Sequence, residues 1–222
     1  MKILAFDTTN STLSVAVTFD GKLQAQENIL ESNRQAELLV IKIEECLKKA
    51  QIWYQDLDLL AFTNGPGSFT GVRVGLSCAK ALGICGDFKI IGISSLHAIA
   101  YDYLPAQNDV ILAVNDARLE EFYIQEFTKN PDGLFLTAKY EPKLIKSAEI
   151  EQFLPTKSFT LCGSGKNMIK NLPKNAQIFE KEDFINAKNI APIGQEIYQK
   201  KNEEIDAEAL YIRAPKISER KK

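Results

Sequence analysis

The sequence of 222 residues predicts an α/β protein with two lobes. Apolar strands and helical segments alternate over the first hundred residues, and a similar order begins again after Pro105. Each run opens with an apolar strand that ends in an aspartate, in AFDTT and in AVNDAR. Because right-handed crossovers turn such alternation into sheets covered by helices, we expect a first lobe over residues 1–104 and a second over 105–222.

The first lobe is expected to place three strands before its first helix. The periodic runs that predict its elements are the strands 2–8, 13–19, 22–30, 57–63 and 89–94 and the helices 33–50 and 70–85. Asp20-Gly21 is a hairpin turn, and Ser32 with Gln35 fits a capping box. The two later strands lack apolar–polar alternation, which is typical of parallel strands covered on both faces.

The second lobe is expected to repeat this order. Its predicted elements are the strands 110–117, 120–127, 134–141 and 159–165, the helices 147–154 and 187–202, and a terminal extended piece over 210–213. The helix 187–202 is a candidate to pack back on the first lobe.

The charge balance gives no global footprint for nucleic acid, because 27 basic and 29 acidic residues leave a net charge of −2. Basic residues gather in the last ten positions, where a solvated tail is favoured over RNA contact. The sequence shows no signal-peptide pattern and no run of transmembrane length. Its four cysteines form no CxxC pair. We therefore expect a cytoplasmic protein with reduced, buried thiols.

The glycine-rich stretch TNGPGSFTG, residues 63–71, raises the question of phosphate binding. It lacks the lysine of a P-loop and the third glycine of the dinucleotide fingerprint. Gly71, Gly75, Ala79 and Gly83 instead recur every four residues, which places small side chains in one stripe along a helix. Because glycine within a helix costs about 1 kcal/mol relative to alanine, the stripe indicates close packing.

The helix 33–50 is apolar over more than half its circumference. Such a helix is buried on two sides. The sequence leaves open whether both sides are covered within the fold or one side receives a partner protein.

Residues able to carry catalysis are few. His97 is the sole histidine, with no cluster of metal ligands near it in the sequence, and no G-x-S-x-G motif is present. Asp7 and Asp116 end their strands, where they could perform acid–base chemistry or equally cap turns.

The stretches AFDTT, NGPGSFTGVRVGLSCAKALG, IIGISSL, VNDARLEEFY, CGSG and ALYIRAP resemble the TsaB family, formerly YeaZ. This resemblance implies the fold of actin, sugar kinases and Hsp70 (the ASKHA fold), with two ribonuclease-H-like lobes. It also implies a non-catalytic subunit that pairs with and activates TsaD, which threonylcarbamoylates the adenosine beside the anticodon of tRNA. The alternatives are a stand-alone ATPase or phosphotransferase using the interlobe cleft and, less favoured, a glycoprotease-like peptidase.

The resemblance further implies that the metal site is absent. TsaD carries His-x-x-x-His after the strand that follows its own glycine-rich helix. With the strands matched, the two ligand positions fall on Ser95 and Ile99. Neither residue type is a usual metal ligand, so the resemblance implies no metal and no catalytic residue.

The resemblance assigns partner binding to the helices 33–50 and 70–85. The implied interface residues are Gln35, Leu38, Leu39, Lys42, Gly71, Gly75 and Ala79. The implied partners are a TsaD-type catalytic subunit, a TsaE-type ATPase and, in the absence of TsaD, a second copy of the chain, with tRNA contacted only indirectly. The family usually has a histidine near Gln35, and here this chain departs from the pattern.

A nucleotide site is implied only weakly. By position in the actin-like fold, its candidates are Asp7, Thr8, Thr9, Asp116, Arg118, Gly163 and Gly165. We expect no tightly bound cofactor, and at most ATP or ADP with Mg²⁺ at a weak or shared site.

Overall fold

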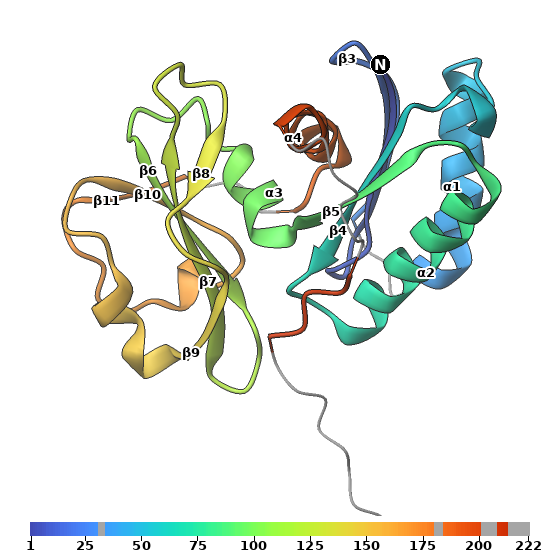
Figure 1. The fold of residues 1–222 in the computed structure, drawn as a ribbon. Coiled ribbons are helices and arrows are strands. Elements are labelled where there is room, and N and C mark those ends of the chain that lie inside the picture. Colours follow the sequence, from blue (N-terminus) through green and yellow to red (C-terminus); the bar gives the residue numbers. More distant parts are fainter. Residues whose placement is uncertain (31–33, 180–183, 201–207, 213–222) are drawn as a thin grey trace, which may run out of the picture.

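The computed structural model describes residues 1–30, 34–179, 184–200 and 208–212. Within these ranges the chain forms two sheets (Figure 1). The first sheet contains β1 (Lys2–Asp7), β2 (Leu13–Phe19), β3 (Lys22–Ile29), β4 (Leu59–Gly65) and β5 (Lys89–Ser94). The second contains β6 (Val110–Asp116), β7 (Glu121–Lys129), β8 (Leu136–Ala138), β9 (Lys143–Lys146), β10 (Phe159–Cys162) and β11 (Ala176–Ile178).

The two sheets share one strand order. The first runs β3-β2-β1-β4-β5, and the second runs β8-β7-β6-β10-β11 with β9 also paired to β7. In both, the opening strand pairs antiparallel with the next strand and parallel with the strand that follows the crossover. The structure therefore shows the same architecture twice in one chain.

The helices of the first lobe divide between the two faces of its sheet. On one face lie α1 (Gln35–Lys49) and α2 (Phe69–Cys85), and on the other lie α3 (Ser95–Tyr101) and α4 (Ala187–Lys200). Figure 1 shows α3 and α4 between the two sheets. Contacts of α4 run to β1, β2, β4 and β5, so a helix late in the sequence covers the first sheet.

The apolar cores follow this layering. One cluster lies between the first sheet and α1 and α2, and includes Phe6, Leu39 and Phe62. A second lies between the two sheets around α3 and α4. A third covers the opposite face of the second sheet. Because the middle cluster draws residues from both lobes, burial of apolar surface holds the lobes together.

The predicted capping box of Ser32 and Gln35 includes Ser32, which lies outside the described residues, so it stays a prediction. The side chain of Gln35 donates a hydrogen bond to the Asn10 carbonyl at 2.7 Å. Two other predicted details are wrong. The run 147–154 forms 3₁₀-helix over Ser147–Phe153. The Cys85 thiol is exposed rather than buried, because α2 ends at this residue, beyond the buried positions of the helix.

The glycine stripe of α2 packs within the lobe. Gly71, Gly75 and Ala79 are buried, and a Cβ placed on Gly71 would lie 1.9 Å from the Thr8 carbonyl oxygen. A Cβ on Gly75 would meet the Thr8 hydroxyl at 2.6 Å. The expectation that this stripe faces a partner protein is therefore wrong, because the small residues admit the chain's own first sheet.

The turn before α2 obeys the same steric rule. A Cβ on Gly67 would lie 2.4 Å from the Thr9 carbonyl oxygen, and Ser68 N donates to that oxygen at 2.7 Å. Gly67 and Gly71 each make room for a backbone carbonyl. The backbone of Thr8 and Thr9 therefore lies against the glycine-rich turn, the segment that the sequence offered as a phosphate-binding loop.

Substituting Gly75 tests this packing. We expect Gly75→Leu to lower the free energy of unfolding by about 1–3 kcal/mol or more, because a large side chain is forced against the sheet. Ser77→Leu, on the exposed side of the same helix, is the matched control and should change stability little. Urea unfolding of both variants checks this, and equal stability of the two would contradict the buried stripe.

Candidate functional site

Asp7, at the end of β1, is fully buried. Its Oδ1 accepts hydrogen bonds from Thr9 N at 3.0 Å, from the Thr9 hydroxyl and from the Thr63 hydroxyl. Its Oδ2 is buried without a hydrogen-bond partner among the described residues. Loss of hydration raises the pKa of this carboxyl, and the hydrogen bonds to it oppose that shift only in part.

Thr8 and Thr9 follow Asp7 and are also fully buried. The Thr8 hydroxyl donates to the Gly71 carbonyl at 2.7 Å, and the Thr9 carbonyl is held by Ser68 N. The structure does bring the three predicted residues together. It also packs them under the start of α2, where their backbone meets Gly67 and Gly71.

The second group of nucleotide candidates lies on the other sheet. Asp116 is exposed at the end of β6, and its backbone N donates to the Ser164 hydroxyl at 3.1 Å. Gly163 has a φ of +97°, and a Cβ there would lie 2.3 Å from the Val114 carbonyl oxygen. Gly165 N donates to the same carbonyl at 2.9 Å. The glycine pair therefore packs against β6 and adjoins Asp116.

The two strand-end aspartates make equivalent turns. Asp7 Oδ1 accepts from the backbone N of Thr9, and Asp116 Oδ1 accepts from the backbone N of Arg118 at 2.7 Å. In each case a carboxylate binds the amide two residues further on, as Asp does in turns. Of the two roles that the sequence left open for these residues, turn capping is the one that the described contacts show.

The turn after Asp116 is tightly wound. Arg118, Leu119 and Glu120 have φ values of 61°, 55° and 57°, all in the left-handed region. Each such residue costs about 1–2 kcal/mol. Two hydrogen bonds offset part of that cost. Arg118 N donates to the Asp116 carboxylate, and Ser147 N donates to the Glu120 carbonyl at 2.7 Å.

The positions matched to the two histidines of TsaD lie in α3. Ser95 is fully buried and donates through its hydroxyl to the Pro66 carbonyl, while Ile99 lies in the core between the sheets. His97 packs against Phe127 with ring centroids 5.1 Å apart. Burial lowers the pKa of His97 to about 4, so its imidazole is neutral near pH 7. The described residues contain no group of three or more His, Cys, Asp or Glu placed to hold a metal ion.

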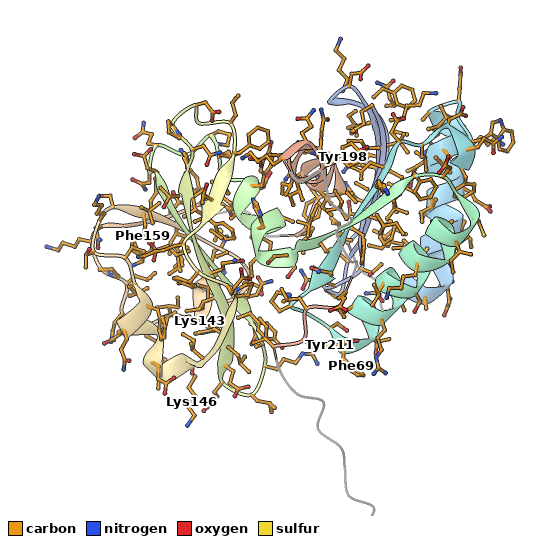
Figure 2. The ribbon with its side chains drawn as sticks, in the orientation of Figure 1. Phe69, Lys143, Lys146, Phe159, Tyr198 and Tyr211 are labelled. Carbon is orange, nitrogen blue, oxygen red and sulfur yellow. The ribbon has the colours of Figure 1, made fainter. Side chains whose placement is uncertain are left out.

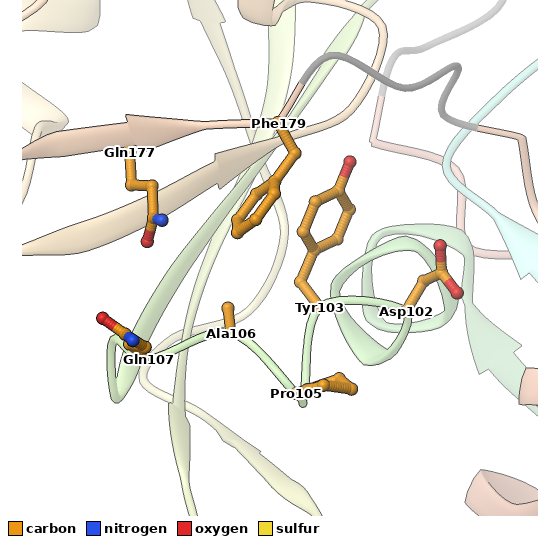
Figure 3. A pocket seen from close by; sticks show the side chains of 7 residues that line it. All are labelled: Asp102, Tyr103, Pro105, Ala106, Gln107, Gln177 and Phe179. Carbon is orange, nitrogen blue, oxygen red and sulfur yellow. The ribbon is translucent and has the colours of Figure 1, made fainter.

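A pocket of about 360 Å³ opens just beyond α3, at the opposite end of this helix from the contact between Ser95 and Pro66 (Figure 3). Tyr103 and Phe179 form one side, with ring centroids 5.7 Å apart. Asp102, Gln107 and Gln177 add polar groups. The pocket includes none of the site residues predicted from the sequence.

The outer surfaces of α1 and α2 carry exposed apolar side chains. Val40 and Ile41 on α1 are each 48% exposed, and Ile84 on α2 is 86% exposed. The two helices lie side by side over the outer face of the first sheet (Figure 1). Exposed apolar side chains therefore occur on both helices that cover this face of the sheet.

The interface residues predicted from the sequence divide into two groups. Leu39, Gly71, Gly75 and Ala79 are buried within the lobe, so their assignment to an interface is wrong. Gln35, Leu38 and Lys42 are partly exposed on α1 and stay predictions. Lys42 pairs with Glu45 at 2.7 Å and lies 3.8 Å from Glu27, so α1 is also tied to β3 by charge.

The sequence showed the helix 33–50 to be apolar over more than half its circumference, although the interface residues predicted from it omitted Val40, Ile41 and Ile84. Val40 and Ile41 fall outside the buried seam of Leu39, Ile43 and Cys46, which marks them as exposed apolar residues. On α2, Arg73, Ser77 and Ile84 are exposed on the side opposite to the glycine stripe. Which side of α2 is exposed follows only once the side facing the sheet is known.

Comparison with solved structures confirms the predicted fold. YeaZ from Pseudomonas aeruginosa superposes with a TM-score of 0.84 over 95% of this chain and 99% of that chain, at 20% sequence identity. Together with the duplicated strand order, this shows a two-lobed α/β fold like that of YeaZ. In the part of the chain that the structure describes, no helix has the length and apolarity to span a membrane.

Comparison with known sequences gives the family. The family model TsaD: tRNA N6-adenosine threonylcarbamoyltransferase matches residues 30–132. The tRNA threonylcarbamoyladenosine biosynthesis protein TsaB of Buchnera aphidicola subsp. Schizaphis graminum is 31% identical over 196 residues, which cover 86% of this chain and 91% of that protein. The protein of the same name from Escherichia coli (strain K12) is 32% identical, over 61% of this chain and 58% of its own length. The chain therefore belongs to the TsaB family.

Proposed function

We propose that this chain is a non-catalytic subunit that pairs with a TsaD-type threonylcarbamoyltransferase and activates it for modification of tRNA in the cytoplasm. The observation that carries the proposal is the exposed apolar surface of α1 and α2 in a member of the TsaB family. In this proposal the outer side of α2 faces the catalytic subunit, while its glycine side holds the helix on the sheet. The same surface pairs two copies of the chain when that subunit is absent.

The side chains at the TsaD metal positions support a non-catalytic role. The Ser95 hydroxyl is committed to the Pro66 carbonyl, and Ile99 offers no donor atom. The neighbouring His97 is held neutral in an apolar environment, with Phe127 against its ring. The helix that would hold a metal in TsaD thus serves here as core between the lobes.

A nucleotide-using enzyme is the second candidate. Its support is the buried Asp7 carboxyl, whose Oδ2 has no hydrogen-bond partner among the described residues. Against it stand the burial of Thr8 and Thr9 and the contacts that close the turn over them. We therefore propose that any ATP or Mg²⁺ used by the complex binds at a site shared with a TsaE-type ATPase.

Charge placed on the helical surface tests the docking role. Ile41→Glu and Ile84→Glu should each weaken pairing with the TsaD-type subunit by about tenfold or more, because a buried carboxylate would lose its hydration without a counter-charge. Leu23→Glu, at a 47% exposed apolar position on β3, is the matched control. Isothermal titration with the purified subunit measures the affinity. Unchanged affinity for both helix variants would remove the proposed surface.

ATP turnover separates the two candidate functions. The pure chain with ATP and Mg²⁺ should show no turnover, and turnover should require the TsaD-type and TsaE-type proteins in the mixture. A phosphate-release assay on the chain alone and on the mixture measures this. Turnover by the chain alone that Asp7→Ala abolishes would instead support the enzyme.

The role of Asp7 can also be tested through pH. Because its pKa is raised in the folded chain, this carboxyl contributes most to stability below its ordinary value of 3.8 and loses that contribution as pH rises through the folded pKa. Asp7→Asn retains an oxygen that accepts from Thr9 and Thr63 but cannot ionise. The stability of the wild type relative to this variant should therefore fall as pH rises above 4. Urea unfolding of both proteins between pH 4 and pH 8 measures their free energies of unfolding. If the wild type instead gains stability relative to the variant as pH rises, the ionised carboxylate is stabilised in the fold and the prediction is wrong.

A further inference from the structure

Residues 208–212 lie against the end of β4 and the start of α2, although more than a hundred residues separate them in sequence (Figure 1). Leu210 N donates to the Asn64 carbonyl at 2.8 Å, and Asn64 Nδ2 donates to the Glu208 carbonyl at 2.9 Å. A Cβ on Gly65 would lie 2.8 Å from the Leu210 carbonyl oxygen. The absence of a side chain at Gly65 therefore opens a slot for the backbone of this segment.

Side chains extend the contact onto the first turn of α2. The ring centroids of Tyr211 and Phe69 lie 5.4 Å apart, and Figure 2 shows the two labelled residues next to each other. The Arg73 guanidinium lies 3.8 Å from the centre of the Phe69 ring, and its Nε donates to the Tyr211 hydroxyl at 3.3 Å. One tyrosine thus joins an aromatic ring and a guanidinium from successive turns of α2.

The contact between residues 208–212 and α2 is partly exposed to solvent. Phe69 is 39% exposed and Tyr211 is 45% exposed, whereas Ile212 is half-buried against the core between the lobes. A segment with few buried contacts can leave its position while the rest of the fold persists. Phe69 and Arg73 lie on α2, the helix whose exposed side forms part of the docking surface.

We propose that residues 208–212 form a displaceable latch. The latch seats in the slot formed by Asn64, Gly65, Phe69 and Arg73, and it fixes the first turn of α2 in the shape that a TsaD-type subunit meets. The link to docking rests on the proposed function, whereas the seating of the latch does not. With the latch released, the chain stays folded, the first turn of α2 opens more often and pairing weakens.

Full-length variants at position 211 test the latch. Tyr211→Ala should speed hydrogen exchange about tenfold at the amides of Gly71 and Val72, which bond to Ser68 in the first turn. Exchange in β1 should not change. Tyr211→Phe keeps the ring on Phe69 and should remain close to the wild type, and Tyr198→Ala, which removes a 37% exposed tyrosine from α4, is the matched control. Exchange read by mass spectrometry or NMR gives the first measurement.

Affinity gives the second measurement. Tyr211→Ala should weaken pairing with the TsaD-type subunit by about three- to tenfold, with Tyr198→Ala unchanged. Unchanged exchange at Gly71 and Val72 would overturn the latch. Faster exchange with unchanged or tighter pairing would overturn its link to docking. Tyr211→Ala could speed exchange while Ile41→Glu and Ile84→Glu pair with the TsaD-type subunit as tightly as the wild type. That result would support the latch and contradict the proposed docking surface, so the two failures are distinguishable.

Discussion

The close approach of α2 to the residues after β1 is the constraint on which the first lobe depends. Thr8 and Thr9 present their carbonyl oxygens to the start of this helix, and only residues without a Cβ fit opposite them. The bond from the Thr8 hydroxyl to the Gly71 carbonyl fixes the helix in that position. With α2 held there, its exposed side is also fixed, and with it the surface proposed to receive the partner.

Gene duplication offers a simple account of the equivalent turns in the two lobes, because the same strand order occurs twice. In each lobe an aspartate at the end of the opening strand binds an amide two residues later. The lobes differ in how these turns are covered. Asp7 is sealed under α2, whereas Asp116 stays exposed beside Ser164. The shared carboxylate therefore has a structural role in both lobes and is accessible to solvent in only one.

The sequence predicted the five strands and the two outer helices of the first lobe closely because their periodicity is strong, whereas the short helix α3 was not among the predicted elements. The strand 89–94 and the helix 70–85 correspond to β5 and to α2 within one residue. Periodicity does not reveal which part of the chain, or which other protein, packs against a given face of a helix. The spacing of Gly71 and Gly75 predicts a smooth face, and whether a sheet or another protein lies against it depends on the three-dimensional course of the chain. For the same reason the contact between Tyr211 and Phe69 could not be read from residues so far apart in sequence.

The position of α4 has a consequence for synthesis of the protein. This helix covers β1, β2, β4 and β5, and its Gly194 fits against Ala61, where a Cβ would lie 2.7 Å from the alanine methyl carbon. During translation the first sheet emerges from the ribosome long before residues 187–200 are made. Until then the apolar side of that sheet lacks its cover, which is the condition under which nascent chains recruit chaperones. The N-terminal lobe is therefore the first part to be translated and among the last to be completed.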